Sequence, residues 1–231
     1  MLHLPQLLNA EEIGAVLQIA QAGQYSDGRA TAGSYLHGVK NNLQHEATPE
    51  QEGQLNQIVI GALMRNAAFC SFALPRKIMP PRLARYEAGM GYGSHVDQAF
   101  MGQGGEPMRS DLSLTLFLSD PTSYQGGELV LETPVGEQEI KLPLGDAVVY
   151  GTTVHHRVAT VDSGTRLVAV TWMQSFVADT AQRQLLHDLR IAKDRVRTGQ
   201  PRQRGGRAAD PQPRQPAAHV ERCLGDGVLS T

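Results

Sequence analysis

The sequence predicts an α+β fold in which N-terminal helices pack on a strand-rich core, a sandwich or jelly roll, followed by a C-terminal helix. Apolar residues first repeat with a helical period, in two segments before residue 65. From about residue 80 the period changes to two, and short strands recur at intervals of roughly ten residues. A last helical segment begins near Asp179.

The bulk composition indicates an ordinary globular chain with an uneven charge distribution. Its 231 residues suffice for one domain with a real core, and 41% of them are hydrophobic and 19% charged. The net charge of −2 combines an acidic body with a basic tail. Residues 183–222 carry ten Lys or Arg and four Asp or Glu, whereas residues 1–182 carry eleven and eighteen.

Targeting features are not evident in the sequence. The N-terminus lacks a basic segment followed by a long apolar one, so we expect no signal peptide. No apolar run approaches the roughly 20 residues of a membrane span, and we expect no membrane partner. Cys70 and Cys223 show neither CxxC nor Cys/His zinc spacing. We therefore expect a cytoplasmic protein.

Two N-terminal helices are predicted from their caps. Asn9 can cap the first helix with Glu12 bonding back, and Gly23 can end it. Thr48 can cap the second, with Pro49 in its first turn and Gln51 at the third position. Apolar residues follow with helical spacing in both: Ile13, Val16, Leu17 and Ala20, then Leu55, Ile58, Val59, Ala62 and Leu63.

The clearest strand runs from Leu112 to Leu118. Its leucines alternate with Ser113, Thr115 and Phe117, which predicts a half-buried strand. Turn residues separate the further predicted strands, at 128–132, 138–142, 147–150 and 166–174.

The third helix is expected to start near Asp179 and to end near Thr198. Its apolar residues include Leu185, Leu186, Leu189 and Val196. Residues 200–218 are rich in Pro, Gly, Gln and Arg, with almost no large apolar side chains, and are predicted to be disordered because they cannot bury enough surface.

Three residues have the composition of a non-haem iron site. His95 and Asp97 are two apart, so a strand would present both on one face. His156 follows a predicted strand and can complete the set, although His155 competes for that role. Two imidazoles and one carboxylate leave open positions on Fe(II) for a co-substrate and O₂, which indicates an oxygenase.

Arg166 opens an apolar strand ten residues after His156. A guanidinium facing inward requires a carboxylate partner, which it can hold with two hydrogen bonds. Beside the metal motif we expect this partner to be a dicarboxylate co-substrate; a structural ion pair is the alternative. The Tyr86 hydroxyl could bond the same carboxylate, or Tyr86 could be a core residue.

The segment 85–97, Arg-Tyr-Glu-Ala-Gly-Met-Gly-Tyr-Gly-Ser-His-Val-Asp, resembles prolyl-4-hydroxylase-type Fe(II)/2-oxoglutarate dioxygenases. The similarity to bacterial PKHD-type hydroxylases, a family associated with iron uptake, is closer and covers about residues 1–190. Segments 39–42, 111–118, 124–129 and 172–175 also match that family's pattern. The resemblance implies a double-stranded β-helix core, iron bound by His95, Asp97 and His156, 2-oxoglutarate bound by Arg166, and dependence on L-ascorbate.

This resemblance divides the chain into four parts. Residues 1–78 would be a helical and strand support region, 79–178 the dioxygenase core, 179–198 the C-terminal helix and 199–231 a basic tail. Two segments depart from the family. The family usually has Tyr-Pro-Ser-Ser-x-Leu-His before its last iron ligand, where this chain has Tyr-Gly-Thr-Thr-Val-His-His at 150–156. The tail does not resemble the family's short ending.

The predicted activity is hydroxylation of a C–H bond of an amino-acid-like, siderophore or protein substrate, with succinate and CO₂ as co-products. A segment after the metal motif is expected to form a mobile loop that shapes the substrate pocket, with Phe100, Met101 and Met108 among its residues. Alternatively, this segment could be a disordered insert without ligand contact.

Other functions remain as alternatives. A non-enzymatic iron-binding or sensing protein would need no Arg166. A zinc hydrolase would need a general base of the HExxH kind, which is lacking. Nucleic acid is not expected as a partner, because nucleic-acid demethylases of this type carry a second arginine where this chain has Trp172. A homodimer is left open.

Overall fold

The computed structural model describes residues 1–31, 38–102 and 107–198. The predicted disordered tail lies outside these residues. Four α-helices are present in the described chain, α1 (Ala10–Ala22), α2 (Pro49–Arg65), α3 (Ala67–Ala73) and α4 (Thr180–Thr198), together with a 3₁₀ turn at Gly28–Thr31. None of them is both long and apolar enough to cross a membrane.

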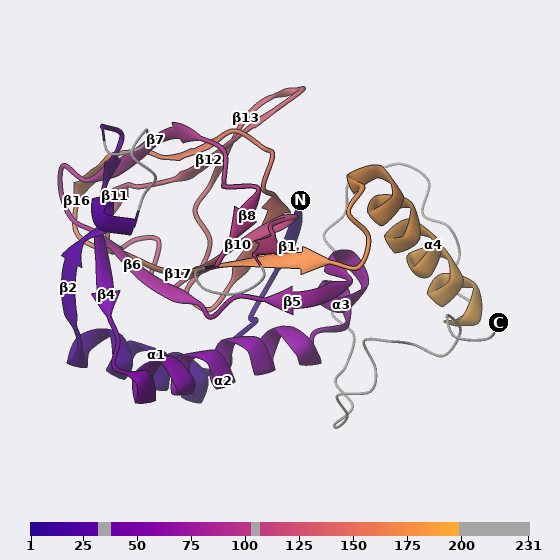
Figure 1. The fold of residues 1–231 in the computed structure, drawn as a ribbon, viewed down its shortest axis with the longest axis horizontal. Coiled ribbons are helices and arrows are strands. Elements are labelled where there is room, and N and C mark those ends of the chain that lie inside the picture. The colour runs from indigo at the N-terminus through magenta and orange to yellow at the C-terminus, as the bar shows by residue number, and fades with distance from the viewer. Residues whose placement is uncertain (32–37, 103–106, 199–231) are drawn as a thin grey trace.

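Two antiparallel sheets form the core (Figure 1). The major sheet contains, in spatial order, β1 (Leu2–Leu4), β14 (Ala147–Gly151), β10 (Leu112–Phe117), β17 (Arg166–Ser175), β6 (Arg82–Tyr86), β4 (Leu43–Glu46) and β2 (Gln24–Asp27), and β5 (Pro75–Ile78) pairs with β17. The minor sheet contains β13 (Gly136–Ile140), β12 (Leu129–Thr133), β15 (His156–Val158), β7 (Gly91–His95) and β3 (Lys40–Asn41). Two-stranded pairs join β11 (Gln125–Gly126) to β16 (Val161–Ser163), and β8 (Phe100–Met101) to β9 (Met108–Arg109).

The predicted helix caps are confirmed. Asn9 and Glu12 form a capping box at α1, and Thr48 and Gln51 form one at α2. Gly23 ends α1 in an extended conformation, and the ring of His45 occupies the space that a Cβ there would need. Close packing therefore accounts for this glycine. Helix α3 was not predicted from the sequence, because a seven-residue helix is too short to show a helical period.

The prediction that the strand at 112–118 is half-buried was wrong. Every residue of β10 is buried. Leu112, Leu114 and Leu116 pack in one apolar cluster with α1, α2 and α3, whereas Phe117 belongs to a second cluster between the two sheets. Helices cover one face of the major sheet, and the minor sheet faces the other (Figure 1). The alternation therefore separates two buried environments, one apolar and one partly polar.

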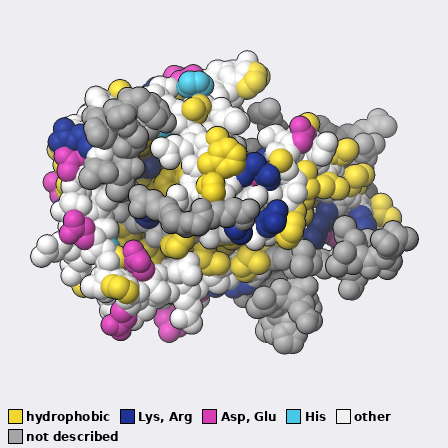
Figure 2. All heavy atoms as spheres, in the orientation of Figure 1, with side chains coloured by type: hydrophobic (Ala, Val, Ile, Leu, Met, Phe, Trp, Pro, Cys, Tyr) yellow, Lys and Arg dark blue, Asp and Glu magenta, His cyan; other side chains and the backbone are white. Residues whose placement is uncertain are grey.

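Helix α4 packs on α3 through polar side chains. Arg183 and His187 are buried, and the His187 ring contacts Ser71 Oγ at 3.1 Å. Its large apolar residues lie at the surface, where Figure 2 shows apolar side chains over this helix. They are Leu185 (59% exposed), Leu186 (46%), Leu189 (57%) and Val196 (82%).

Truncation of Leu116 tests the helix-facing cluster. Leu116 is 0% exposed, so we expect Leu116→Ala to lower the free energy of unfolding by about 2–5 kcal/mol, from lost transfer energy and a residual cavity. Val135→Ala, at a position 80% exposed, should change it by less than about 0.5 kcal/mol. Urea unfolding measures both, and equal midpoints for the two variants would contradict this packing.

Candidate metal centre

His95 and His156 face each other across two neighbouring strands of the minor sheet. They are direct partners in the register of β7 and β15, and their ring centroids are 4.3 Å apart. Both are buried, at 8% and 5% exposure. Each ring contacts the carbonyl two residues earlier through Nδ1, at 2.8 Å to Gly93 and 2.9 Å to Val154. A carbonyl only accepts hydrogen bonds, so Nδ1 carries the proton and Nε2 offers its lone pair.

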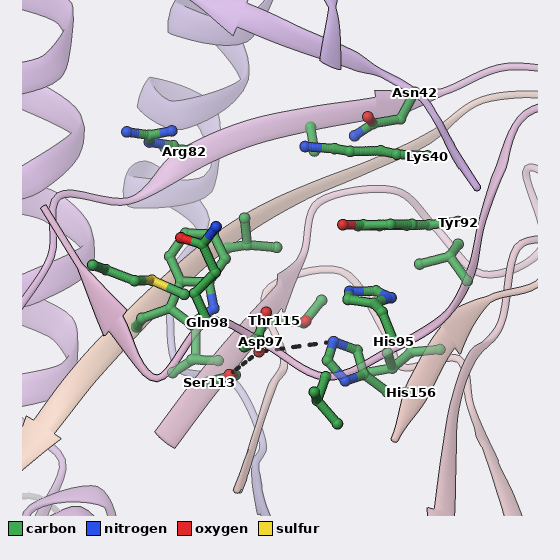
Figure 3. A pocket seen from close by; sticks show the side chains of 18 of the residues that line it. Lys40, Asn42, Arg82, Tyr92, His95, Asp97, Gln98, Ser113, Thr115 and His156 are labelled. Atoms are coloured by element: carbon green, nitrogen blue, oxygen red, sulfur yellow. Dashed lines mark hydrogen bonds and ion pairs between the residues drawn. The ribbon is translucent and has the colours of Figure 1, made fainter. Parts of the chain in front are cut away.

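Asp97 reaches the same point from outside the strand. The expectation that His95 and Asp97 share one strand face was wrong, because β7 ends at His95. The backbone N–H of Asp97 instead donates to the Thr152 carbonyl at 3.2 Å, which fixes the chain beyond the strand. Ser113 Oγ donates to Asp97 Oδ2, and this oxygen lies 3.8 Å from His156 Nε2 (Figure 3).

The three side chains can hold one metal ion. One ligand atom from each of His95, Asp97 and His156 lies within 4.8 Å of the others. Burial, and secondly the neighbouring His156, lowers the pKa of His95 to about 4. The ring is therefore neutral at physiological pH, as metal coordination requires. Two imidazoles and one carboxylate on one side of an ion suit Fe(II).

His155 does not share this position. It is exposed and absent from the pocket that contains the three side chains, although it directly precedes His156. Its carbonyl accepts a hydrogen bond from the Glu132 N–H at 2.8 Å, next to the last pair of β12 and β15. His155 lies just before β15, and its exposure and absence from the pocket favour His156 as the ligand.

Arg166 lies in the same pocket without a carboxylate partner. It is 1% exposed and pairs with Tyr86 in the register of β17 and β6. Its guanidinium lies over the rings of Tyr86 and Phe117, 5.0 and 5.7 Å from their centroids. Within the described chain, its Nε and Nη1 have no hydrogen-bond partner and no carboxylate lies within ion-pair distance. The alternative of a structural ion pair therefore finds no support.

Burial without a counter-ion is costly for the Arg166 guanidinium. It lowers the pKa of Arg166 below its ordinary value. Tyr124 is buried beside it, and its hydroxyl also has no hydrogen-bond partner among the described residues. Gly127, at φ +68°, separates the two: a Cβ there would lie 3.1 Å from Arg166 Cδ and 3.2 Å from Tyr124 Cε2. These unsatisfied donors fit a dicarboxylate such as 2-oxoglutarate.

One pocket of about 360 Å³ contains the three candidate metal-binding side chains and Arg166. Tyr86 also lines it, 4% exposed, and burial raises the pKa of its hydroxyl. The pocket has further polar residues that the sequence analysis did not assign to a site: Lys40, Asn42, Gln44, Arg82, Gln98, Ser113 and Thr115. Ser113 and Thr115 were indicated by alternation along a strand, and the segments 39–42 and 111–118 by their match to the family pattern.

The predicted loop after the metal motif is partly a hairpin. Phe100 and Met101 form β8 and pair with Met108 and Arg109 of β9. Phe100 and Met101 line the pocket, which agrees with a role in shaping it. Residues 103–106, with Gly104 and Gly105, lie outside the described residues.

Comparisons with known proteins agree with this geometry. Residues 81–174 match the 2OG-Fe(II) oxygenase superfamily. A PKHD-type hydroxylase of Thermosynechococcus vestitus is 46% identical over 189 residues, covering 82% of this chain and 84% of the relative. A PKHD-type hydroxylase of Gluconacetobacter diazotrophicus is 44% identical over 191 residues, with the same coverage.

Solved structures share the fold. A prolyl hydroxylase of Trichoplax adhaerens, in complex with a peptide fragment of hypoxia inducible factor, superposes with a TM-score of 0.55 at 15% identity, over 80% of this chain and 86% of that one. HygX of Streptomyces hygroscopicus, with nickel, 2-oxoglutarate and hygromycin B bound, gives 0.52 at 11% identity, over 76% and 83%. The predicted α+β double-stranded β-helix is thus confirmed. By its identity to relatives over most of its length, the chain belongs to the PKHD-type hydroxylases, enzymes of the 2OG-Fe(II) oxygenase superfamily.

Proposed function

We propose that this hydroxylase binds Fe(II) through His95, Asp97 and His156, and binds the distal carboxylate of 2-oxoglutarate through Arg166 and Tyr86. The observation that carries the proposal is a buried guanidinium without a counter-ion in the pocket that contains the three metal-binding side chains. When bound, iron and 2-oxoglutarate supply the oxidation of a substrate C–H bond by O₂, with succinate and CO₂ as co-products.

The residues of the chain position and enclose these groups. The carbonyls of Gly93 and Val154 orient the imidazoles so that both Nε2 atoms point inward. Ser113 holds one oxygen of Asp97. Arg166 carries a fixed positive charge that neutralises one carboxylate of the co-substrate in a site shielded from water. The carboxylate of Asp97 completes the set of two imidazoles and one carboxylate, and its presence favours hydroxylation.

Several finer features of the function are proposals. The substrate is an amino-acid-like molecule, a siderophore or a protein side chain, and L-ascorbate keeps the iron reduced. A cytoplasmic location and a link to iron uptake rest on the sequence analysis and on the resemblance to an iron-uptake-associated family. Whether the chain forms a homodimer stays open, and nucleic acid is not expected as a partner.

The division into a support region at 1–78, a core at 79–178 and a helix at 179–198 also remains our proposal. The superfamily match at 81–174 falls within the proposed core. The non-enzymatic alternative is not favoured, because a simple iron store or sensor has no use for the buried guanidinium of Arg166.

Replacement of the histidines tests the metal ligands. We expect His156→Ala to weaken Mn(II) binding by more than about 100-fold, since loss of even an outer-shell partner of a ligand costs about 10–100-fold. His155→Ala is the matched control and should bind Mn(II) like the wild type. Electron paramagnetic resonance of unbound Mn(II) measures both affinities under exclusion of oxygen. The reverse order of effects would assign the third ligand to His155.

Replacement of Arg166 tests the co-substrate site. We expect Arg166→Gln to raise the Kd for 2-oxoglutarate of the Mn(II)-loaded protein about 10- to 100-fold, the loss of hydrogen bonds to a charged group. The Kd of Arg166→Lys should fall between those of the wild type and Arg166→Gln, because an ammonium keeps the positive charge but loses the planar, two-pronged geometry of the guanidinium. Arg65→Gln, which removes a guanidinium on the helical side, should not change the Kd. Calorimetry measures each value, and wild-type affinity in Arg166→Gln would refute the assignment.

Removal of the Ser113 hydroxyl tests how Asp97 is oriented. We expect Ser113→Ala to weaken Mn(II) binding about tenfold, because the carboxylate loses a hydrogen bond that fixes its position. Ser94→Ala is the control, since Ser94 precedes His95 but its hydroxyl donates to Glu132 at the surface. Equal Mn(II) affinities of the two variants would show that Ser113 does not position Asp97.

A further inference from the structure

Two basic residues line the pocket across from the candidate metal centre. Every second residue of the segment 40–44 faces the pocket, which brings in Lys40. The same alternation along β6 brings in Arg82. Figure 3 shows these two side chains near each other, on the side of the pocket opposite His156 and Asp97. They come from strands of different sheets, β3 and β6, so the fold rather than local sequence places them together.

The pocket has more positive than negative charge. Its charged lining residues are Lys40, Arg82, Arg166 and Asp97. The proposed function uses Arg166 for 2-oxoglutarate and Asp97 for iron. The proposed function assigns no role to Lys40 and Arg82, which are both positive and line the same pocket. Among described residues, no carboxylate lies within ion-pair distance of Arg82.

The two cations lie close enough to repel each other. Burial, and secondly the charge of Arg82, lowers the pKa of Lys40 to about 8. Lys40 is 8% exposed, and its Nζ lies over the Tyr92 ring, 5.5 Å from the centroid. Arg82 is exposed at the outer part of the pocket. A bound anion would relieve this repulsion and stabilise the charged form of Lys40.

Several apolar side chains line the same pocket. They are Met79, Phe100, Met101, Val170 and Trp172. Such a lining favours a ligand with an apolar body and one charged end, rather than a fully hydrophilic anion. Gln98 adds an amide that can hydrogen-bond a carboxylate or a neighbouring polar group.

We propose that Arg82 and Lys40 bind a carboxylate of the substrate, so that the substrate is an organic acid whose apolar portion presents the reacting C–H bond to the iron. This inference rests on the proposed function, because it takes Arg166 as the site of 2-oxoglutarate. It narrows the substrate from any amino-acid-like, siderophore or protein group to a molecule with a carboxylate on an aliphatic or aromatic stem.

The test uses the full chain loaded with Mn(II) and with N-oxalylglycine, a non-reacting analogue that fills the 2-oxoglutarate site. The probes are straight-chain carboxylates from butyrate to octanoate and the corresponding neutral amides. Proton relaxation of each probe by Mn(II) reports binding beside the metal. We expect the acids to bind at least about tenfold more tightly than their amides, the effect of one charge-assisted contact.

Variants assign this preference to the two residues. Arg82→Gln and Lys40→Gln should each weaken acid binding about tenfold or more and leave amide binding unchanged. Arg85→Gln is the matched control: it lies on the same strand but outside the pocket, where it pairs with Glu87 at 3.0 Å. Arg82 is exposed, so its substitution is not expected to disturb folding, and thermal unfolding checks this.

Each outcome is decisive. With N-oxalylglycine still bound, any one of three results would overturn the inference. Acids and amides could bind equally tightly, acids could fail to bind, or Arg82→Gln could bind acids as tightly as the wild type. Failure of the wild type to bind N-oxalylglycine would overturn both the inference and the proposed function.

Discussion

The pairing of β7 with β15 is the interaction on which the candidate metal centre depends. These strands are far apart in sequence, and their antiparallel register places His95 directly opposite His156. Each imidazole is also oriented by the carbonyl two residues earlier in its own segment, that of Gly93 or Val154. A one-residue slip in this register would turn one of the two rings to the outer face.

The two sheets contribute different parts of the site. The minor sheet supplies the imidazoles, whereas the major sheet supplies Arg166, Tyr86 and the hydroxyl of Ser113. The helices stabilise the major sheet from its other face, so its inner face can carry polar groups without loss of the apolar core. A buried guanidinium is tolerated there only if a ligand compensates for its lost hydration.

The sequence predicts the parts of this structure that depend on local chemistry. The caps at Asn9 and Thr48 were identified because a capping box is a short-range pattern. The candidate metal-binding residues could be recognised because their types and spacing are restrictive. The strand position of Asp97 was not correct, because the end of β7 is set by its pairing with β15 and not by its own residues.

Features set by tertiary contacts could not be predicted. The burial of β10 on both faces required knowledge of the helices and of the second sheet. Lys40 and Arg82 line the same pocket because segments from different sheets come together there. The exposure of the leucines of α4 could not be predicted either, because an apolar period predicts a helix but not which of its faces packs against the protein.

A crystal structure of the complex with Mn(II) and 2-oxoglutarate, prepared without oxygen, tests the central claim most directly. Our account predicts a metal ion bound by Nε2 of His95, Nε2 of His156 and a carboxylate oxygen of Asp97, with the distal carboxylate of 2-oxoglutarate on Arg166. A metal ion bound by His155, or a co-substrate whose carboxylate avoids Arg166, would contradict it.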